Sequence, residues 1–301
     1  MLLKQKNLSK IYSKNLVVNS INMHVEKGKI YGLLGKNGAG KTTTMCMLLN
    51  LTHPNGGDIL LFGKNPKKYP EIYSNIGSII ETPGFYENLT AYENLKLISK
   101  LRGDYNPYMI NSVLKIVNLN IEKSKKFKDF SLGMKQRLGI AAAIMHSPEL
   151  LILDEPINGL DPFGIKEIRQ LLKKLAHEFG ITILISSHIL SEIENIADVI
   201  GVMDNGVLVE EITREELYER LDKHVEFEVS DINHVANILK ALKLKENKDY
   251  AYNETTIYLY THLNLTEKFN ELFVKAGIGV RKINLCEENL EEFFTRFISD
   301  N

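Results

Sequence analysis

Residues 35–43 constrain the fold of this chain most, because glycines stand at fixed spacing there and a lysine and two threonines follow directly. An apolar run before them, residues 29–34, predicts a buried strand, and the residues after them predict a helix that starts near Lys41. A strand, a glycine-rich turn and a helix in this order form the context of the phosphate-binding pattern G-x-x-x-x-G-K-[ST]. The stretch is Gly35, Lys36, Asn37, Gly38, Ala39, Gly40, Lys41, Thr42 and Thr43.

The residue types of this loop suit a nucleoside triphosphate. Glycines let successive backbone N–H groups turn inward, and the start of a helix adds the positive end of its dipole. Lys41 supplies a charge for the β- and γ-phosphates, and the Thr42 hydroxyl is placed to bind Mg²⁺. The alternative is a glycine-rich turn without a ligand, which the strand before it and the Lys-Thr pair disfavour.

Composition sets outer limits on the function. The 301 residues suggest about two domains, and a net charge of −1 gives no reason to expect a nucleic-acid partner. We find no signal peptide at the N-terminus and no apolar run of the roughly 18–20 residues that a bilayer span needs, so any membrane span should belong to another subunit. Cys46 and Cys286 stand in no metal-like spacing, which suggests a reduced cytosolic compartment.

Two further stretches place polar side chains after predicted strands. Asp154 and Glu155 follow the apolar run 150–153, and His188 follows a predicted strand over residues 181–185. The carboxyl ends of strands in an open α/β sheet face the ligand crevice. We therefore expect Asp154 to hold Mg²⁺ and Glu155 to orient or deprotonate an attacking water. The alternatives are helix-capping acids and a structural histidine.

Weaker signals surround these stretches. Ser131 and Gly133 precede a predicted helix and suit either a helix cap, the better interpretation when seen alone, or a phosphate site. Tyr12 suits either a half-buried strand position or stacking on a purine base. Glu81 ends a predicted strand that begins at residue 76, and Asp161 stands in a turn over residues 158–162.

The remaining pattern divides the chain. Antiparallel strands are predicted over residues 2–32, a hairpin strand over 56–63, helices within 90–119, and a hairpin with an Asn-Gly turn over 199–209. The character changes after residue 222. Residues 223–301 predict a small α+β domain of β-α-β-α-β-α order, with strands at 225–229, 256–260 and 280–285 and helices near 234–242, 266–276 and 288–298.

Taken in order, these stretches resemble the ATP-binding subunit of an ABC transporter over about residues 1–220. The resemblance implies an α/β fold: a P-loop NTPase core with an antiparallel β subdomain and a helical subdomain at about 84–146, within a domain of residues 1–222. It also implies ATP and Mg²⁺ as cofactors. Tyr12 would stack on adenine, Glu155 and His188 would be catalytic, and Thr42 and Asp154 would support the metal.

The resemblance further implies an assembly. ATP would be sandwiched between two copies of the chain, with Ser131 and Gly133 binding the nucleotide of the second copy and Asp161 communicating across the dimer. Integral membrane permease subunits would supply the membrane path, which places the chain peripherally on the cytoplasmic face of the cell membrane.

Two positions depart from the usual family pattern. Glu81 stands where a glutamine is usual, and its extra negative charge would weaken metal-free ATP binding and tighten the Mg²⁺ site. Leu132 replaces a glycine between Ser131 and Gly133, which puts the contact with the second nucleotide in question. With the short C-terminal domain, these departures resemble the bacitracin-resistance and lantibiotic-immunity branch, whose members export antimicrobial peptides. The alternatives are an exporter of another drug or lipid, a soluble ABC protein of translation or repair, and an ATP-binding regulator that does not hydrolyse.

Overall fold

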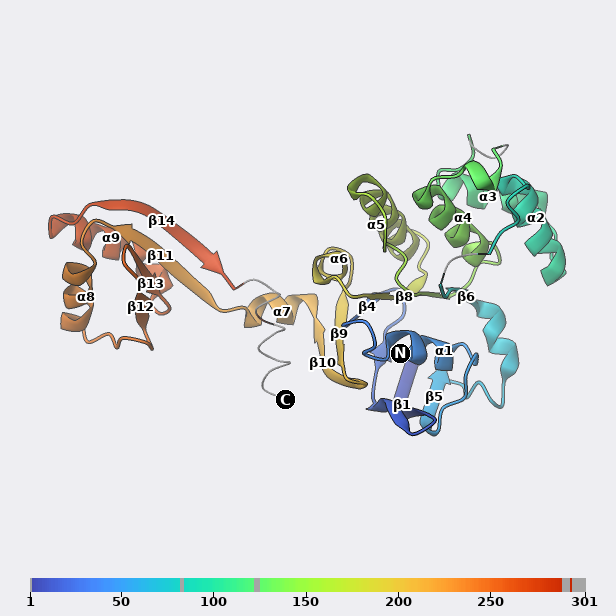
Figure 1. Cartoon of the computed structure of the whole chain (residues 1–301), viewed down its shortest axis with the longest axis horizontal. Helices are drawn as coiled ribbons and strands as arrows, with labels where there is room; N and C mark the ends of the chain where they lie inside the picture. Colours follow the sequence, from blue (N-terminus) through green and yellow to red (C-terminus); the bar gives the residue numbers. More distant parts are fainter. Residues whose placement is uncertain (1, 82–83, 122–124, 289–292, 294–301) are drawn as a thin grey trace. The chain divides into compact units, whose positions relative to one another are not determined.

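The computed structural model describes all residues except 1, 82–83, 122–124, 289–292 and 294–301. The chain forms two compact units, one ending at Arg214 and the other beginning at Glu215 (Figure 1). The division falls at the first residue of helix α7 (Arg214–Arg220), a few residues before the boundary at 222/223 that we expected from the sequence.

A six-stranded sheet forms the centre of the first unit, with the order β10-β9-β4-β8-β7-β6. Pairing is parallel from β9 to β6, and β10 joins antiparallel to β9. Strands such as β7 are buried along their whole length, as expected where both faces of a parallel sheet are covered. The bounds are β4 (Ile30–Leu34), β6 (Ile76–Ile79), β7 (Leu150–Leu153), β8 (Thr182–Ser187), β9 (Val199–Asp204) and β10 (Val207–Thr213).

A second, antiparallel sheet lies in the same unit. Its long strand β1 pairs with β2, β3 and β5. One apolar cluster joins the two sheets, since it includes Leu3 and Leu61 of the antiparallel sheet and Leu33 and Ile152 of the central sheet. The bounds are β1 (Leu3–Tyr12), β2 (Asn15–Ile21), β3 (His24–Val25) and β5 (Gly56–Leu61).

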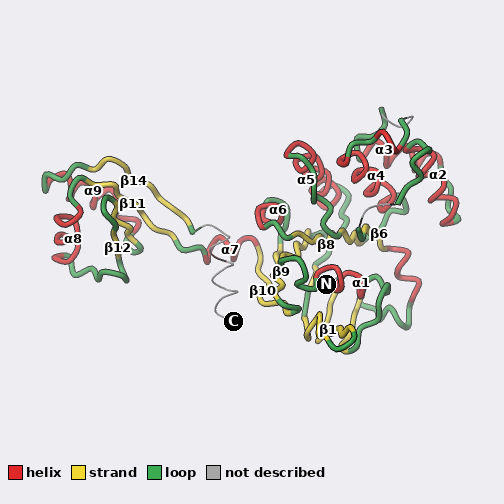
Figure 2. Tube along the Cα trace, viewed as in Figure 1, coloured by secondary structure: helices red, strands yellow, loops and turns green. Residues whose placement is uncertain are grey.

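The helices of the first unit confirm the predicted helical segments. Helices α2, α3 and α4 pack on one another, and Figure 2 shows them as a helix-rich group. A capping box between Thr90 and Glu93 starts α2, and Gly103 in a left-handed conformation ends it. The bounds are α1 (Lys41–Leu48), η1 (Pro70–Asn75), α2 (Ala91–Arg102), α3 (Pro107–Ile116), η2 (Phe127–Asp129), α4 (Leu132–Ile144), α5 (Pro162–His177) and α6 (Leu190–Glu194).

The second unit is a four-stranded antiparallel sheet with the order β12-β13-β11-β14 and two helices packed against one face. Its bounds are β11 (Lys223–Val229), α8 (Ile232–Ala241), β12 (Tyr250–Tyr252), β13 (Thr256–Leu259), η3 (Leu263–Leu265), α9 (Thr266–Lys275) and β14 (Val280–Glu287). The predicted order of elements was wrong by one strand. Strand β12 has three residues, too few to show an alternating pattern in the sequence. The predicted helix at 288–298 falls almost entirely outside the described residues.

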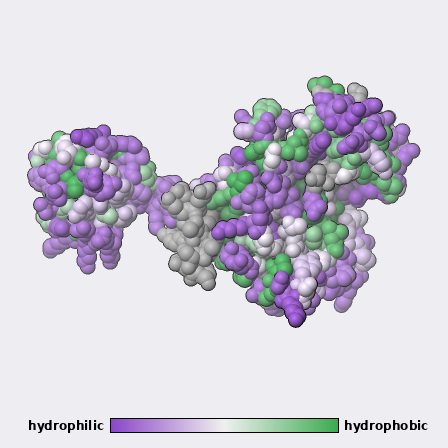
Figure 3. All heavy atoms as spheres, in the orientation of Figure 1, coloured by the Kyte–Doolittle hydropathy of each residue, from purple (hydrophilic) through white to green (hydrophobic). Residues whose placement is uncertain are grey.

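Figure 3 shows a visible face of the second unit that is largely hydrophilic, with apolar residues in scattered patches. Among the described residues, no helix combines the length and the apolar character that crossing a bilayer requires.

Candidate active site

The glycine-rich loop between β4 and α1 has the backbone that its sequence predicts. Gly40 caps α1 with φ of 101°, and Gly38 has φ of 86°, both in the region that favours glycine. Packing adds a second reason: a Cβ atom on Gly35 would lie 2.4 Å from the carbonyl oxygen of Met203, and one on Gly40 would lie 2.8 Å from that of Val17. The loop is therefore held against β2 and β9 with no room for side chains at these positions.

The hairpin turn between β9 and β10 supports the loop from behind. The Gly206 N–H donates to the carbonyl oxygen of Ala39 at 3.1 Å, and Asn205 and Gly206 both have positive φ, as in the predicted Asn-Gly turn. The exposed part of the loop is Lys36, Asn37 and Gly38, so its open side faces solvent.

Lys41 is the buried cation of the site. Its ammonium donates to the carbonyl oxygens of Gly35 at 2.6 Å and Lys36 at 3.3 Å, and lies 3.2 Å from Oε1 of Glu155. The side chain is 5% exposed. An ammonium held by backbone oxygens and one carboxylate at the glycine-rich loop suits a polyanion such as a triphosphate.

Asp154 follows β7 directly and receives two hydroxyl donors. Thr42 Oγ1 donates to Oδ2 at 2.6 Å, and the buried Ser186 Oγ donates to Oδ1 at 2.5 Å. The structure thus places side by side the two residues that the sequence assigned to Mg²⁺, Thr42 and Asp154. Hard oxygen donors of this kind are the ligands that Mg²⁺ prefers, and Thr42 is exposed enough to reach a bound phosphate.

Glu155 and His188 face each other across the ends of β7 and β8. Oε2 of Glu155 lies 2.8 Å from Nδ1 of His188, while Oε1 faces Lys41. The backbone of Glu155 has φ of 47°, a conformation that costs a non-glycine residue on the order of 1–3 kcal/mol and is concentrated at active sites. Its N–H donates to Ser186 Oγ at 2.8 Å, which helps to hold that conformation.

Glu81 lies just beyond the end of β6, the strand paired with β7. Burial raises the pKa of the Cys46 thiol, and the carboxylates of Asp154 and Glu81 raise it further. The charges of Asp154 and Glu81 thus both act on Cys46, which lies one helical turn after Thr42. Glu81 itself has φ of 63° and an exposed side chain.

Three other predicted site residues, Tyr12, Ser131 and Asp161, contact residues outside the phosphate loop. Tyr12 is 45% exposed, its hydroxyl lies 3.4 Å from Thr52 Oγ1, and Lys10 Nζ sits 4.8 Å from its ring centroid. Ser131 caps α4 by accepting from the Met134 N–H at 3.3 Å, and Asp161 caps α5 by accepting from the Gly164 N–H at 2.8 Å. Ser131 therefore has the capping role that its sequence context favoured, and Asp161 has one that the sequence analysis did not anticipate.

Gly133 lies where the starts of the two capped helices, α4 and α5, come close together. A Cβ atom there would lie 3.9 Å from a methyl group of Leu160 and 4.0 Å from the Cα atom of Gly164, so the start of α4 packs beside the start of α5. Leu132 is 47% exposed at the first position of α4. Within the described part of the chain, Ser131 Oγ bonds to its own helix, and Gly133 lies beside Leu160 and Gly164 rather than at the phosphate loop.

Sequence reasoning missed Ser186. This side chain is fully buried, donates to Asp154 and accepts from the Glu155 N–H, so it positions both acids. The available signal was its position directly after the apolar run 181–185 and two residues before His188. Ser187 is similar, since it donates to the buried carboxylate of Glu192 at 2.7 Å and so anchors the start of α6.

Comparisons with known proteins agree with this geometry. The family model described as ABC transporter matches residues 18–158. The bacitracin transport ATP-binding protein BcrA of Enterococcus faecalis is 55% identical over 98% of this chain and 96% of its own length. The lantibiotic transport ATP-binding protein SrtF of Streptococcus pyogenes is 46% identical over 69% of this chain and 89% of its own length.

Solved structures give the same result. A structure of an ATP-binding subunit of an ABC transporter superposes with a TM-score of 0.64 at 32% identity, covering 73% of this chain and 93% of the other. With the phosphate loop, the two acids and the histidine gathered at one sheet edge, these likenesses leave one conclusion. The chain belongs to the ABC transporter family, as an ATP-binding and ATP-hydrolysing subunit.

Proposed function

We propose that this chain powers a membrane exporter that removes antimicrobial peptides of the bacitracin or lantibiotic type. The observation that carries the enzymatic part is the Glu155 carboxylate, whose two oxygens face Lys41 and His188 directly above the phosphate loop. The nearly full-length likeness to a bacitracin transport protein supports the cargo.

The residues at the loop fit a metal-bound triphosphate. Thr42 Oγ1 and Asp154 Oδ2, already 2.6 Å apart, would hold Mg²⁺. The charge of Glu81 acts on Cys46 together with that of Asp154, and in this proposal Glu81 supports the same metal ion. When bound, Mg²⁺ neutralises phosphate charge and orients the β- and γ-phosphates. N–H groups of the loop and of the first turn of α1 would bind the phosphate oxygens, and Lys41 would exchange its carbonyl contacts for them.

Glu155 then acts on the attacking water. Drawing Lys41 toward the phosphates frees Oε1, which can accept a hydrogen bond or a proton from the water. His188 keeps Nδ1 toward Oε2, so Nε2 is the ring nitrogen left for the γ-phosphate. Ser186 keeps Asp154 and Glu155 in register through its two hydrogen bonds.

A second copy of the chain completes the site in this proposal. Ser131 and Gly133 lie at the N-terminus of a 13-residue helix, where N–H groups can bind a phosphate that another copy presents. Asp161, at the start of the neighbouring helix, would transmit closure between copies, and Tyr12 would stack on adenine after Lys10 leaves its ring. Closure over ATP and reopening after hydrolysis would drive permease subunits in the membrane, with the chain on the cytoplasmic face.

The hydrolysis step has a direct test in Glu155→Gln. We expect ATP binding to persist and turnover to fall by about 10²–10⁴-fold, the usual contribution of a positioned general base. Steady-state phosphate release from purified chain measures this, with Glu178→Gln, an exposed residue at the end of α5, as the matched control. Unchanged turnover in Glu155→Gln would remove this carboxylate from the mechanism.

The cargo is tested separately by growth. Deleting the gene in its host should raise sensitivity to bacitracin or a lantibiotic, and the wild-type gene should restore resistance while the Glu155→Gln gene should not. If the deletion changes sensitivity to a lipophilic drug alone, the chain serves the alternative exporter of another cargo. That result would reject the peptide cargo but would leave the proposed ATP hydrolysis untouched.

A further inference from the structure

The second unit presents a polar face on the side of its sheet opposite the helices. Side chains of strand β11 alternate between the two faces of the sheet. Val225 and Phe227 are buried in the core, and His224 and Glu226, each one residue earlier, lie on the other face. The register pairs His224 with Cys286 on the neighbouring strand β14. Residues separated by more than sixty positions in sequence therefore lie directly across from each other.

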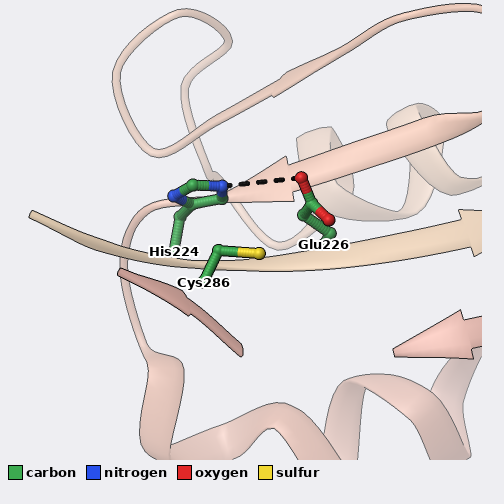
Figure 4. Close-up of side chains that lie close together, drawn as sticks. All are labelled: His224, Glu226 and Cys286. Carbon is green, nitrogen blue, oxygen red and sulfur yellow. Dashed lines mark ion pairs between the residues drawn. The ribbon is translucent and has the colours of Figure 1, made fainter. Parts of the chain in front are cut away.

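The three side chains bring three kinds of ligand atom together (Figure 4). One atom from each of His224, Glu226 and Cys286 lies within 4.8 Å of the others, and Nε2 of His224 is 3.7 Å from Oε1 of Glu226. In Figure 4 the sulfur of Cys286 lies on the same side as the imidazole and carboxylate. All three residues are partly buried, so solvent can still deliver a ligand.

Neighbouring side chains hold this cluster in place. Asn284 Nδ2 donates to the sulfur of Cys286 at 3.3 Å, a contact that would also stabilise a thiolate. The His224 ring packs beside the rings of Tyr258 and Tyr260, each with centroids 5.9 Å away. Such outer contacts orient the ligands of metal sites and tune their affinity.

The spacing and donor types match one class of ion. With metal–ligand bonds of about 2.0–2.3 Å, two ligands of a tetrahedral zinc site lie roughly 3.3–3.8 Å apart. The upper end of that range belongs to pairs that include sulfur, whereas a nitrogen and an oxygen ligand lie roughly 3.3–3.5 Å apart. The imidazole–carboxylate separation of 3.7 Å is therefore slightly longer than in a bound pair, and rotation about side-chain bonds would bring these groups and the sulfur to bonding distance. A thiolate with an imidazole selects Zn²⁺ or a similar soft ion over Mg²⁺ and Ca²⁺.

We propose that His224, Glu226 and Cys286 bind one Zn²⁺ ion, with the fourth position open to water or an added ligand. The ion joins β11 to β14 and so stabilises the sheet by mass action when it binds the folded chain preferentially. This site is separate from the residues that we assign to ATP and Mg²⁺, and it stands whether or not the proposed cargo is correct.

Cobalt serves as the spectroscopic probe. Co²⁺ is added to metal-free, full-length chain with excess Mg²⁺ and no nucleotide, and the ultraviolet band of a cobalt–thiolate bond is followed. We expect one Co²⁺ per chain to give this band and Zn²⁺ to displace it. Cys286→Ser should remove the band, and His224→Gln and Glu226→Gln should each weaken binding by at least about 10-fold, the lower end of what loss of an outer contact costs a metal site.

Two variants control for other sites. Cys46→Ser removes the other cysteine, and His234→Gln removes an exposed histidine of α8; both should keep the band and the affinity. The ligand variants lie on the face away from the core and should keep the wild-type circular dichroism. If a variant unfolds, the wild-type chain still tests the proposal. The proposal then requires that Zn²⁺ raise the melting temperature of the wild-type chain and protect one of its thiols from alkylation.

The contrary results are equally specific. The proposal fails if millimolar Co²⁺ gives no thiolate band with the wild-type chain. It also fails if Cys46→Ser removes the band, or if Cys286→Ser binds Co²⁺ and Zn²⁺ as tightly as the wild-type chain does.

Discussion

The two units gather reactive side chains by different geometries. In the first unit, Asp154, Glu155 and His188 follow parallel strands, whose carboxyl ends meet at one edge of the sheet. In the second unit, His224 and Cys286 meet because antiparallel strands place them in register on one face. In the first set, any two neighbouring parallel strands bring the residues that follow them to one edge, whereas the second set depends on the exact register of the strand pair.

This difference teaches what a sequence can reveal. A polar residue after an apolar run marks the edge of a parallel sheet wherever it occurs in the chain. Cross-strand neighbours leave no such mark, since a shift of one residue would turn each side chain to the opposite face.

The largest stability effect should come from the core of the second unit. Phe227 is fully buried and its ring lies edge-on to Phe273 at 5.3 Å, so Phe227→Ala should destabilise this unit by about 3–5 kcal/mol. Urea unfolding followed with and without ATP separates the two units, because ATP stabilises the first. Leu242→Ala, at a half-exposed position, should have little effect. An equal shift in the ATP-sensitive transition would show that the units unfold as one.

A smaller loss is expected at the edge of the parallel sheet. Ser186→Ala leaves a buried Asp154 oxygen and the Glu155 N–H without their partner, which should cost about 1–3 kcal/mol in the first unit. Turnover should fall as well, because both acids lose their support. The exposed Ser191 provides the control Ser191→Ala, expected to be nearly neutral. Wild-type stability and turnover in Ser186→Ala would mean that the acids are held by other contacts.

The charge of Glu81 can be detected through Cys46. Burial raises the pKa of this thiol, and Asp154 and Glu81 raise it further, so Glu81→Gln should lower that pKa and speed alkylation at mildly alkaline pH. A Cys286→Ser background leaves Cys46 as the reporter. Glu87→Gln, an exposed acid in the same loop, should not change the rate. Identical rates in all three chains would place Glu81 away from the metal-binding acids.

The smallest effect concerns pH. Burial lowers the pKa of His146, the positive charge of Arg102 lowers it further, and a contact of 3.1 Å with the Ile76 carbonyl opposes both. The folded chain thus disfavours protonation relative to the unfolded chain. The stability that neutral His146 gives the folded chain is fully present above the ordinary imidazole pKa. It is lost as the pH falls below that pKa toward the lowered pKa of the folded chain.

The first unit should therefore lose stability between about pH 7.5 and about pH 5.5, and His146→Gln should flatten that dependence. Urea midpoints at the two pH values measure it. His177→Gln, an exposed histidine at the end of α5, is the comparison variant. An unchanged slope in His146→Gln would contradict the shift.

The sequence predicted the parts of the site that follow from local chemistry. The structure brings Glu155 and His188 together at one sheet edge, as the polar strand ends predicted, and it places Thr42 beside Asp154, while their roles toward Mg²⁺ and water stay predictions. Ser186 was missed because a buried serine in a strand carries no motif. Strand β12 was missed because it is short. The His224–Cys286 pair was missed because the spacing of residues along the chain does not reveal which residues of two antiparallel strands pair.

The central claim is that two copies close over ATP, each completing the site of the other. Sedimentation of the Glu155→Gln chain with Mg²⁺ and ATP tests this most directly, because blocked hydrolysis should trap the closed pair. We predict a dimer with ATP, a monomer without it, and loss of the dimer when Ser131→Arg blocks the start of α4. A chain that stays monomeric at saturating ATP would contradict the account.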